Sequence, residues 1–238
     1  MATTIKGSAL DASEIAGDLG IGGTPVTGAA GSKTAHIKGT SAGAYMRLTT
    51  DTSGHTASDG LDIILGGGVN PDAYIWNRES GPLKFGTNNT EQMQIDSAGR
   101  VTTPNQPAFR AYTNYSAHTK LTHSKPYFSV ISHNIGGHFG VGTQRFTAPV
   151  SGTYLFSVHT LMEQPSGYSS IELKKNGGRV SVCHSPSSGV TSYFPLELTE
   201  EVYLTIGDYV EVYGHNSAST GGWYGTANYN SFSGHLIG

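Results

Sequence analysis

Residues 152–158, Gly-Thr-Tyr-Leu-Phe-Ser-Val, constrain the fold most, because their side chains alternate strictly in character. Tyr154, Phe156 and Val158 fall on one face of an extended chain and the residues between them on the other, as in a β-strand with a period of two. Just before them, Pro149 stands where no ladder N–H is available and Gly152 starts the strand, which predicts a tight corner. The alternation therefore predicts a core strand.

Aromatic and turn residues recur at fixed intervals before this strand. Phe128, Asn134, Phe139 and Phe146 lead into it, and the spacing reads F-x5-N-x4-F-x6-F-x5-G-x-Y-x-F. This spacing resembles the signature of the C1q family of jelly rolls. Val158 departs from that signature, because the family usually has a second aromatic residue there.

Three further segments extend the pattern. Residues 204–212 resemble the family's LxxGDxVxV turn and inner strand, and residues 232–237 resemble its closing FSGxLL strand. Asn176-Gly177 lies between two alternating runs, which predicts a hairpin with a type I′ turn. The resemblance implies an all-β fold, with a C1q/TNF-like jelly-roll head over residues 105–238. From the patterns described below, we expect a short β-rich trimeric shaft (41–104) and an extended N-terminal anchor (1–40) to precede this head.

The composition supports a β-rich chain and excludes several function classes. The 238 residues include 33 glycines and only 13% charged residues, which disfavours long helices. The net charge of -3, without a basic run, argues against nucleic acid, and no apolar run approaches the ~20 residues of a membrane span. A single cysteine, Cys183, and a start that does not resemble a signal peptide predict synthesis in a reducing cytoplasm.

Short alternating runs separated by glycine-rich turns predict a meander of strands in residues 41–104. The runs are Tyr45–Leu48, Leu61–Leu65, Ala73–Trp76, Leu83–Phe85 and Met93–Ile95. A single layer of such hairpins leaves its apolar face exposed to water, so we expect identical chains to cover that face in a homotrimer.

The N-terminal 40 residues are small, polar and glycine-rich, and can bury little apolar surface. Two interpretations stay open: a disordered leader, or an anchor that orders by adding itself to a partner.

Residues 81–101, which contain Met-Gln-Ile-Asp-Ser-Ala-Gly-Arg-Val, resemble the segment that precedes the distal head in many bacteriophage fibre proteins. That resemblance implies location in a virion, on either its tail or its capsid. The partner of residues 1–40 would then be another virion protein.

Strand alternation places four long loops at the end of the head that points away from the shaft. Their aromatic residues predict a ligand-binding surface for a host surface glycan or protein. The candidate residues are Tyr168, His215, Asn216, Trp223 and Tyr224. The alternative is that the Trp223–Tyr224 loop only folds over its own head.

Large aromatic residues are assigned to the core or to the trimer contacts. The core and trimer candidates are Phe128, Phe139, Phe146, Tyr154, Phe156 and Phe232. Among outward residues, Phe232 or Tyr213 is expected to pack at the trimer interface.

Catalysis, metals and cofactors are not expected. His118, His123, His133 and His138 cluster in the sequence but complete no zinc pattern, although His133 or His138 could line a three-fold axis. Cys183 has no evident base, and Glu200-Glu201 falls in a predicted loop over residues 199–207.

Three functional hypotheses remain at this stage. The first is a phage fibre whose head attaches to the host surface, with avidity from three sites. The second is a purely architectural capsid or tail decoration. The third, an enzyme that depolymerises host polysaccharide, has the least support.

Overall fold

A computed structural model describes residues 19–21, 35–115, 118–163, 167–186, 193–217 and 222–238. Most of the predicted N-terminal anchor lies outside these residues. The described residues form strands and turns without a helix, as the composition predicts, so they include no helix that could cross a membrane. The chain divides into two compact units, Met1–Thr102 and Thr103–Gly238.

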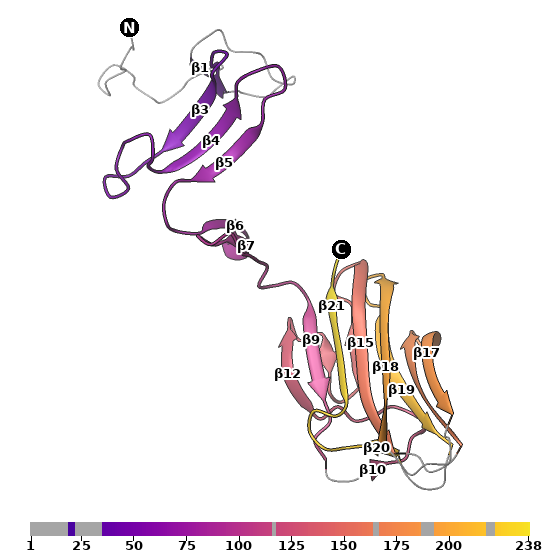
Figure 1. Ribbon diagram of the computed structural model, residues 1–238. Coiled ribbons are helices and arrows are strands. Elements are labelled where there is room, and N and C mark those ends of the chain that lie inside the picture. Colours follow the sequence, from indigo (N-terminus) through magenta and orange to yellow (C-terminus); the bar gives the residue numbers. More distant parts are fainter. Residues whose placement is uncertain (1–18, 22–34, 116–117, 164–166, 187–192, 218–221) are drawn as a thin grey trace. The chain divides into compact units, whose positions relative to one another are not determined.

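The first unit is built from short strands (Figure 1). The strands are β1 (Leu19–Ile21), β2 (Ala35–Ile37), β3 (Gly43–Leu48), β4 (Leu61–Gly66), β5 (Ala73–Asn77), β6 (Leu83–Thr87), β7 (Thr90–Ile95) and β8 (Val101–Thr102). β1 and β2 pair in parallel, whereas β3–β4–β5 and β6–β7–β8 form two antiparallel sheets. All five runs predicted from the sequence are strands.

One face of the β3–β5 sheet is organised by a buried carboxylate. Asp62 accepts hydrogen bonds from Arg47 Nε at 2.6 Å and from Arg78 Nε at 3.0 Å. The hydrogen bond from Arg47 lowers the pKa of Asp62 to about 2, against the opposing effect of burial, and Arg78 adds to the lowering. The acidic residue therefore serves a structural ion-pair network on this face.

The second unit, here called the head, is a sandwich of two antiparallel sheets. The β15 sheet has the order β10-β20-β15-β21-β9-β12, and β18 pairs with β15. Its strands are β9 (Ala108–Tyr112), β10 (His118–Thr119), β12 (Val130–Ile135), β15 (Gly152–Glu163), β18 (Tyr193–Leu204), β20 (Gly222–Tyr224) and β21 (Ser231–Leu236).

The β19 sheet faces it, with the order β13-β14-β19-β16-β17, and β11 also pairs with β19. Its strands are β11 (Thr122–Ser124), β13 (Phe139–Gly140), β14 (Arg145–Thr147), β16 (Tyr168–Lys175), β17 (Gly178–Pro186) and β19 (Tyr209–Asn216). Residues 139–147 thus contain two short strands, β13 and β14, joined by a turn.

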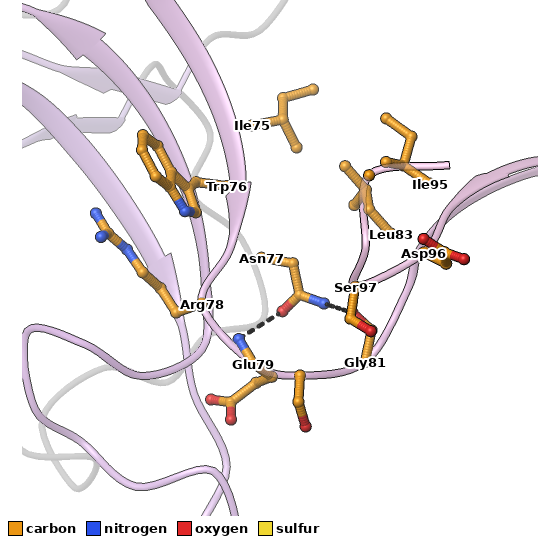
Figure 2. A pocket seen from close by; sticks show the side chains of 12 residues that line it. Ile75, Trp76, Asn77, Arg78, Glu79, Gly81, Leu83, Ile95, Asp96 and Ser97 are labelled. Carbon is orange, nitrogen blue, oxygen red and sulfur yellow. Dashed lines mark hydrogen bonds between the residues drawn. The ribbon is translucent and has the colours of Figure 1, made fainter. Parts of the chain in front are cut away.

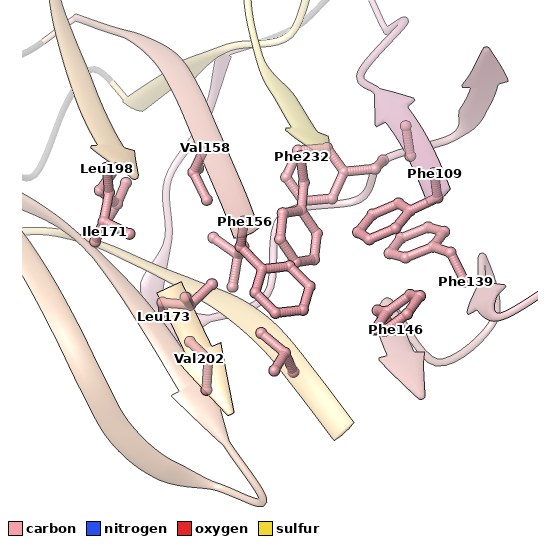
Figure 3. Close-up of a cluster of buried hydrophobic side chains, with 14 of the residues drawn as sticks. Phe109, Phe139, Phe146, Phe156, Val158, Ile171, Leu173, Leu198, Val202 and Phe232 are labelled. Carbon is pink, nitrogen blue, oxygen red and sulfur yellow. The ribbon is translucent and has the colours of Figure 1, made fainter. Parts of the chain in front are cut away.

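Aromatic side chains fill the space between the two sheets (Figure 3). Along β15, buried and partly exposed residues alternate, as the sequence predicts. The Phe109 ring stacks on Phe139 at 4.8 Å and on Phe146 at 5.1 Å between centroids. The buried set includes Phe128, Phe139, Phe146, Tyr154, Phe156, Val158 and Phe232.

Phe232 corrects one expectation. Its side chain is fully buried within a single head and packs edge-on against Phe109 at 4.9 Å. It points inward because it lies on the core face of β21, opposite Val158 of β15. The suggestion that Phe232 contacts a neighbouring chain is therefore wrong.

The hairpin turn between β16 and β17 is confirmed. Asn176 and Gly177 have φ angles of 50° and 82°, the two positive values that a type I′ turn requires. Asn176 also binds the neighbouring turn, because its Nδ2 donates to Asp208 Oδ1 at 2.7 Å.

The strands fix two ends of the sandwich. The C-terminus lies where β15 begins, since Thr153 N–H donates to the Gly238 carbonyl. At the opposite end, called the far end, β15 ends at Glu163 and β16 begins at Tyr168. The short strands β10 and β20 also lie there (Figure 1).

One predicted boundary in the head differs from the structure. β18 continues to Leu204, so Glu200 and Glu201 lie in a strand that pairs with β15 and not in the loop predicted over residues 199–207. Pairing with β15 sets this boundary.

Candidate binding surface

A row of residues on the outer face of the β19 sheet brings polar and aromatic groups together at the far end. Ser170 of β16 lies directly opposite His215 of β19 and also opposite His184 of β17. Residues opposite each other in antiparallel strands share a face, and so do residues two apart along a strand. Tyr168, His184 and His215 therefore project from the same face.

Four rings on this face form a continuous row of ring contacts. The Tyr168 ring stacks on the His184 ring, with centroids 5.0 Å apart at an interplanar angle of 16°. The His215 ring also lies 5.0 Å from the Tyr168 ring but is tilted by 38° against it. The His123 ring continues the stack on the other side of His215, at 4.0 Å and an interplanar angle of 19°. We name the four residues, His184, Tyr168, His215 and His123, the aromatic ladder.

A backbone irregularity places His123 in the aromatic ladder. Thr122 pairs with His215 and Ser124 with Gly214, so the register between β11 and β19 shifts at His123. His123 also has a φ of 51°, in the left-handed region that non-glycine residues seldom adopt. This bulge turns its ring onto His215.

His215 is held in its neutral form. Burial lowers its pKa, and nearby His123 and Lys120 lower it further, whereas Glu172 acts in the opposite direction. Its Nδ1 is buried and has no hydrogen-bond partner among the described residues. A proton there would have no acceptor, so the His215 ring is uncharged at neutral pH.

Two buried carboxylates beside the ladder hold four cations. Glu211 accepts from Arg145 at 2.8 Å and pairs with Lys125, while Glu172 pairs with Arg179 and Lys174. Burial raises the pKa of each carboxyl, but the hydrogen bonds and charges of the cations outweigh it, and the pKa of both is lowered. Both carboxylates are therefore ionised at neutral pH.

The arrangement leaves this face positive. Residues 103–238 contain seven Lys or Arg and seven Asp or Glu. Four of these cations and only two carboxylates make the network on the outer face, whereas β15 and β18 carry four carboxylates. The latter are Glu163, Glu197, Glu200 and Glu201.

The fold and this surface can now be compared with known proteins. A model of the C1q domain matches residues 108–237, more than half of the chain. The chain belongs to the C1q domain family. Among solved structures, the globular domain of zebrafish complement 1qA is similar, with 22% identity and a TM-score of 0.46, over 56% of this chain and 98% of that chain. A search of curated protein sequences gives no match.

The C1q assignment confirms the jelly-roll head expected from the aromatic spacing. C1q domains commonly form trimers, often bind ligands and are typically not enzymes.

Trp223 of the C1q domain corrects a second expectation, because it is fully buried. It lies in β20 between Met162 of β15 and Thr119 of β10, and its indole ring packs over Gly214. A Cβ at Gly214 would lie 2.6 Å from the indole, so glycine is required there. Trp223 closes the far end of the core and is not an exposed ligand contact.

The other predicted contacts of the C1q domain separate into three groups. Asn216 is fully buried, and its backbone N–H donates to the Leu121 carbonyl, so it also cannot be an exposed contact. Tyr224 lies in β20 and makes edge-to-face contacts with Tyr193 of β18 at 5.2 Å and with Tyr229, in the turn before β21, at 4.9 Å. Only Tyr168 and His215 meet in the aromatic ladder. His123 and His184 complete it and were not among the predicted binding residues.

Metal and catalytic candidates in the C1q domain stay dispersed. Across the described ranges, no three His, Cys, Asp or Glu side chains are placed to share a metal ion. Cys183 is partly buried and packs against the core from β17.

A shallow hollow of about 640 Å³ lies in the first unit, between the end of β5 and the β6–β7 hairpin (Figure 2). Asn77 shapes its rim, since its Nδ2 donates to the Gly81 carbonyl and its Oδ1 accepts from Glu79 N–H. Arg78 lies over the Trp76 ring at 4.8 Å and also binds Asp62. The polar side chains of Asn77 and Arg78 thus already have partners within the first unit. We interpret the hollow as a structural feature and not as a ligand site.

The burial of His215 predicts that acid destabilises the head. The pKa of His215 is lowered in the folded head, so the unfolded chain binds more protons as pH falls through about 6.5, and stability is lost below that pH. We expect the urea midpoint to fall between about pH 7.5 and pH 5.5. Trp223 fluorescence, in a Trp76→Phe background, reports the transition.

His215→Gln is the matched control for this titration. It keeps a polar side chain and removes the ionisation, so the acid-induced decrease in midpoint should become smaller. An unchanged decrease in the variant would show that the titration of His215 does not contribute.

Proposed function

We propose that the protein is a trimeric bacteriophage virion fibre whose C1q head attaches to the host cell surface. The observation that carries this proposal is a bare apolar face on the first unit, joined in one chain to a C1q domain. The resemblance of residues 81–101 to phage fibre segments supports the virion origin.

The apolar face lies opposite the Asp62 network on the β3–β5 sheet. Met46, Ile63 and Ile75 are directly opposite one another across the three strands, and all three are exposed. Leu48 and Leu65 extend this surface and are 57% and 50% exposed. We name these five residues the apolar face.

A single sheet cannot bury such a face by itself, because the strands have no second layer. Identical chains offer identical faces, and rotation about a three-fold axis brings three of them together. C1q domains commonly form trimers, so a trimeric head would hold the three sheets at high effective concentration.

Attachment is assigned to the far end of the head. The aromatic ladder is an exposed set of rings on a rigid sheet, which is the usual setting of a recognition surface. Three copies would bind a cell surface with avidity although each contact is weak.

Two measurements test the proposal. Light scattering of the full chain at micromolar concentration should give the mass of a trimer, and a monomer would contradict the assembly. Fluorescently labelled protein should adsorb to host cells and compete with virions, and failure to adsorb would contradict attachment.

The burial of Trp223 and Asn216 favours a second candidate, an architectural decoration without receptor binding. Tyr168→Ala with His184→Ala separates the two candidates, because both side chains lie on the surface of the sheet. Virions that carry the double variant should adsorb poorly if the head attaches to cells, and normally if it is architectural.

A further inference from the structure

The outer face of the β15 sheet, which points away from the core, carries opposite charges at its two sides. At one side, β9 places Arg110 on this face, directly opposite His133 of β12. At the other side, β18 exposes Glu197 and Glu201. Three strand spacings separate β9 from β18, so the two sides lie about 14 Å apart. The charges of the two sides therefore do not pair within one head.

Arg110 and Glu201 are charged groups without a partner of opposite charge. The Arg110 guanidinium lies 5.6 Å from the centre of the Tyr112 ring, on the same face. Among the described residues, neither Arg110 nor Glu201 makes an ion pair or a side-chain hydrogen bond. By contrast, Glu172 and Glu211 of the β19 sheet each bind two cations. The guanidinium of Arg110 can therefore donate to a carboxylate of another chain.

Small side chains fill the middle of the face. The row that starts at Arg110 continues through Ser233 of β21, Ser157 of β15 and Thr199 of β18. None of these three side chains is longer than that of threonine, so a second chain can approach the sheet closely. Leu155, in the neighbouring row, adds a half-buried apolar group.

The course of the chain gives the direction of a symmetry axis. β9 begins at the end of the head that holds the C-terminus, because Ala108 pairs with His235. In the proposed fibre, three chains pass from their first units into their heads at this same end. The three-fold axis then runs roughly along the strands of the β15 sheet.

Such an axis brings the two charged sides of neighbouring copies to the same level. Rotation about an axis leaves every residue at its own height along that axis. Arg110 shares its row with Thr199, so Arg110 of one copy meets the next copy near Thr199. Glu197 and Glu201 lie two residues before and after Thr199, about 7 Å along the strand, within reach of a long arginine side chain.

We propose that the outer face of the β15 sheet is the contact between neighbouring heads, where Arg110 of one copy pairs with Glu201 of the next. The partner is a second copy of this chain, and the side that carries β9 meets the side that carries β18. Three such head-to-tail contacts close a ring. The inference rests on the proposed trimeric fibre and assigns the surface and the level at which its heads associate.

The β19 sheet offers no comparable complementarity. Its outer face has four cations around two buried carboxylates, which leaves an excess of two positive charges. Two copies of that face would repel each other, whereas the outer face of the β15 sheet contains both signs and attracts its own kind. Charge therefore favours the β15 sheet as the contact between heads.

Charge-reversal variants of the full chain test this contact. Arg110→Glu places like charges together in all three contacts, and Glu201→Lys does the same with positive charge. Each variant should raise the concentration at which half of the trimers dissociate by at least about tenfold. The double variant, Arg110→Glu with Glu201→Lys, should regain most of the lost affinity because it reverses the ion pair. Mass photometry over a dilution series measures the fraction of trimer.

Lys120→Glu is the matched control for the change in charge. Lys120 is exposed, makes no ion pair among the described residues and lies between β10 and β11 at the far end. Its reversal should leave trimer dissociation unchanged. Melting curves check that each variant is folded, so that dissociation is not confused with unfolding of the head.

The pattern of results separates this contact from the trimer on which it rests. Recovery in the double variant supports the pairing of Arg110 with Glu201. If the wild type is a trimer and folded Arg110→Glu dissociates no more than the wild type, the contact is wrong and the trimeric fibre stands. A double variant no better than either single variant also overturns the contact. A monomeric wild type contradicts both proposals.

Discussion

Replacing Phe109 with alanine is expected to destabilise the head by about 3–5 kcal/mol. The side chain is 1% exposed and stacks on Phe139 and Phe146, while Phe232 meets it edge-on. Its removal leaves a cavity where four strands meet, because the surrounding rings cannot close over the gap without losing their own contacts. The melting temperature of the head should fall by about 10–20 °C.

Calorimetry of the full chain measures this effect on the head transition. Phe85→Ala is a matched control, since Phe85 is 37% exposed and belongs to the first unit. It should leave the head transition in place. If the melting temperature of the head is unchanged in Phe109→Ala, the contacts of the Phe109 ring do not stabilise the core.

The core of the head could be predicted from sequence because its signals are local. The alternation from Gly152 to Val158 reports directly which side chains of β15 face inward. Asn176-Gly177 likewise predicts a turn by conformational preference alone, and both φ angles agree. Neither conclusion needs knowledge of a distant part of the chain.

The aromatic ladder could not be predicted because a bulge shifts its register. If residues paired regularly outward from the Asn176-Gly177 turn, with Lys175 opposite Gly178, Cys183 would lie opposite Ser170. The structure pairs Lys174 with Arg179 but Leu173 with Ser181, so one residue is inserted and His184 moves opposite Ser170. The same shift exposes Val182 and turns Cys183 toward the core. No feature of the local sequence predicts this bulge.

The prediction that Trp223 is an exposed ligand contact is wrong for a related reason. Its neighbours in sequence are glycine, serine and threonine, which are typical of an exposed loop. Its burial depends on β10, about a hundred residues earlier, and on the space above Gly214. A two-residue strand and a glycine on another strand give no sequence pattern from which such a contact could be inferred.

The apolar face of the first unit gives the second large effect. Ile63→Asp is expected to abolish the folded, protease-resistant state of the β3–β5 sheet in the full chain. In a single chain Ile63 is 44% exposed, and a substitution at such a position changes stability by about 0.5 kcal/mol or less. In the proposed trimer the same change places three carboxylates in one apolar contact, where burying an unpaired charge is costly.

This difference makes the variant a test of assembly and not only of stability. Limited proteolysis, followed by mass spectrometry, should show cleavage within residues 43–77 of the variant and protection of the wild type. Val69→Asp is the control, because Val69 is 97% exposed and lies in the turn between β4 and β5, so the same charge there should change nothing. Equal resistance of Ile63→Asp and the wild type would mean that the apolar face stays in water, and the trimeric fibre would then have to be assembled by the head alone.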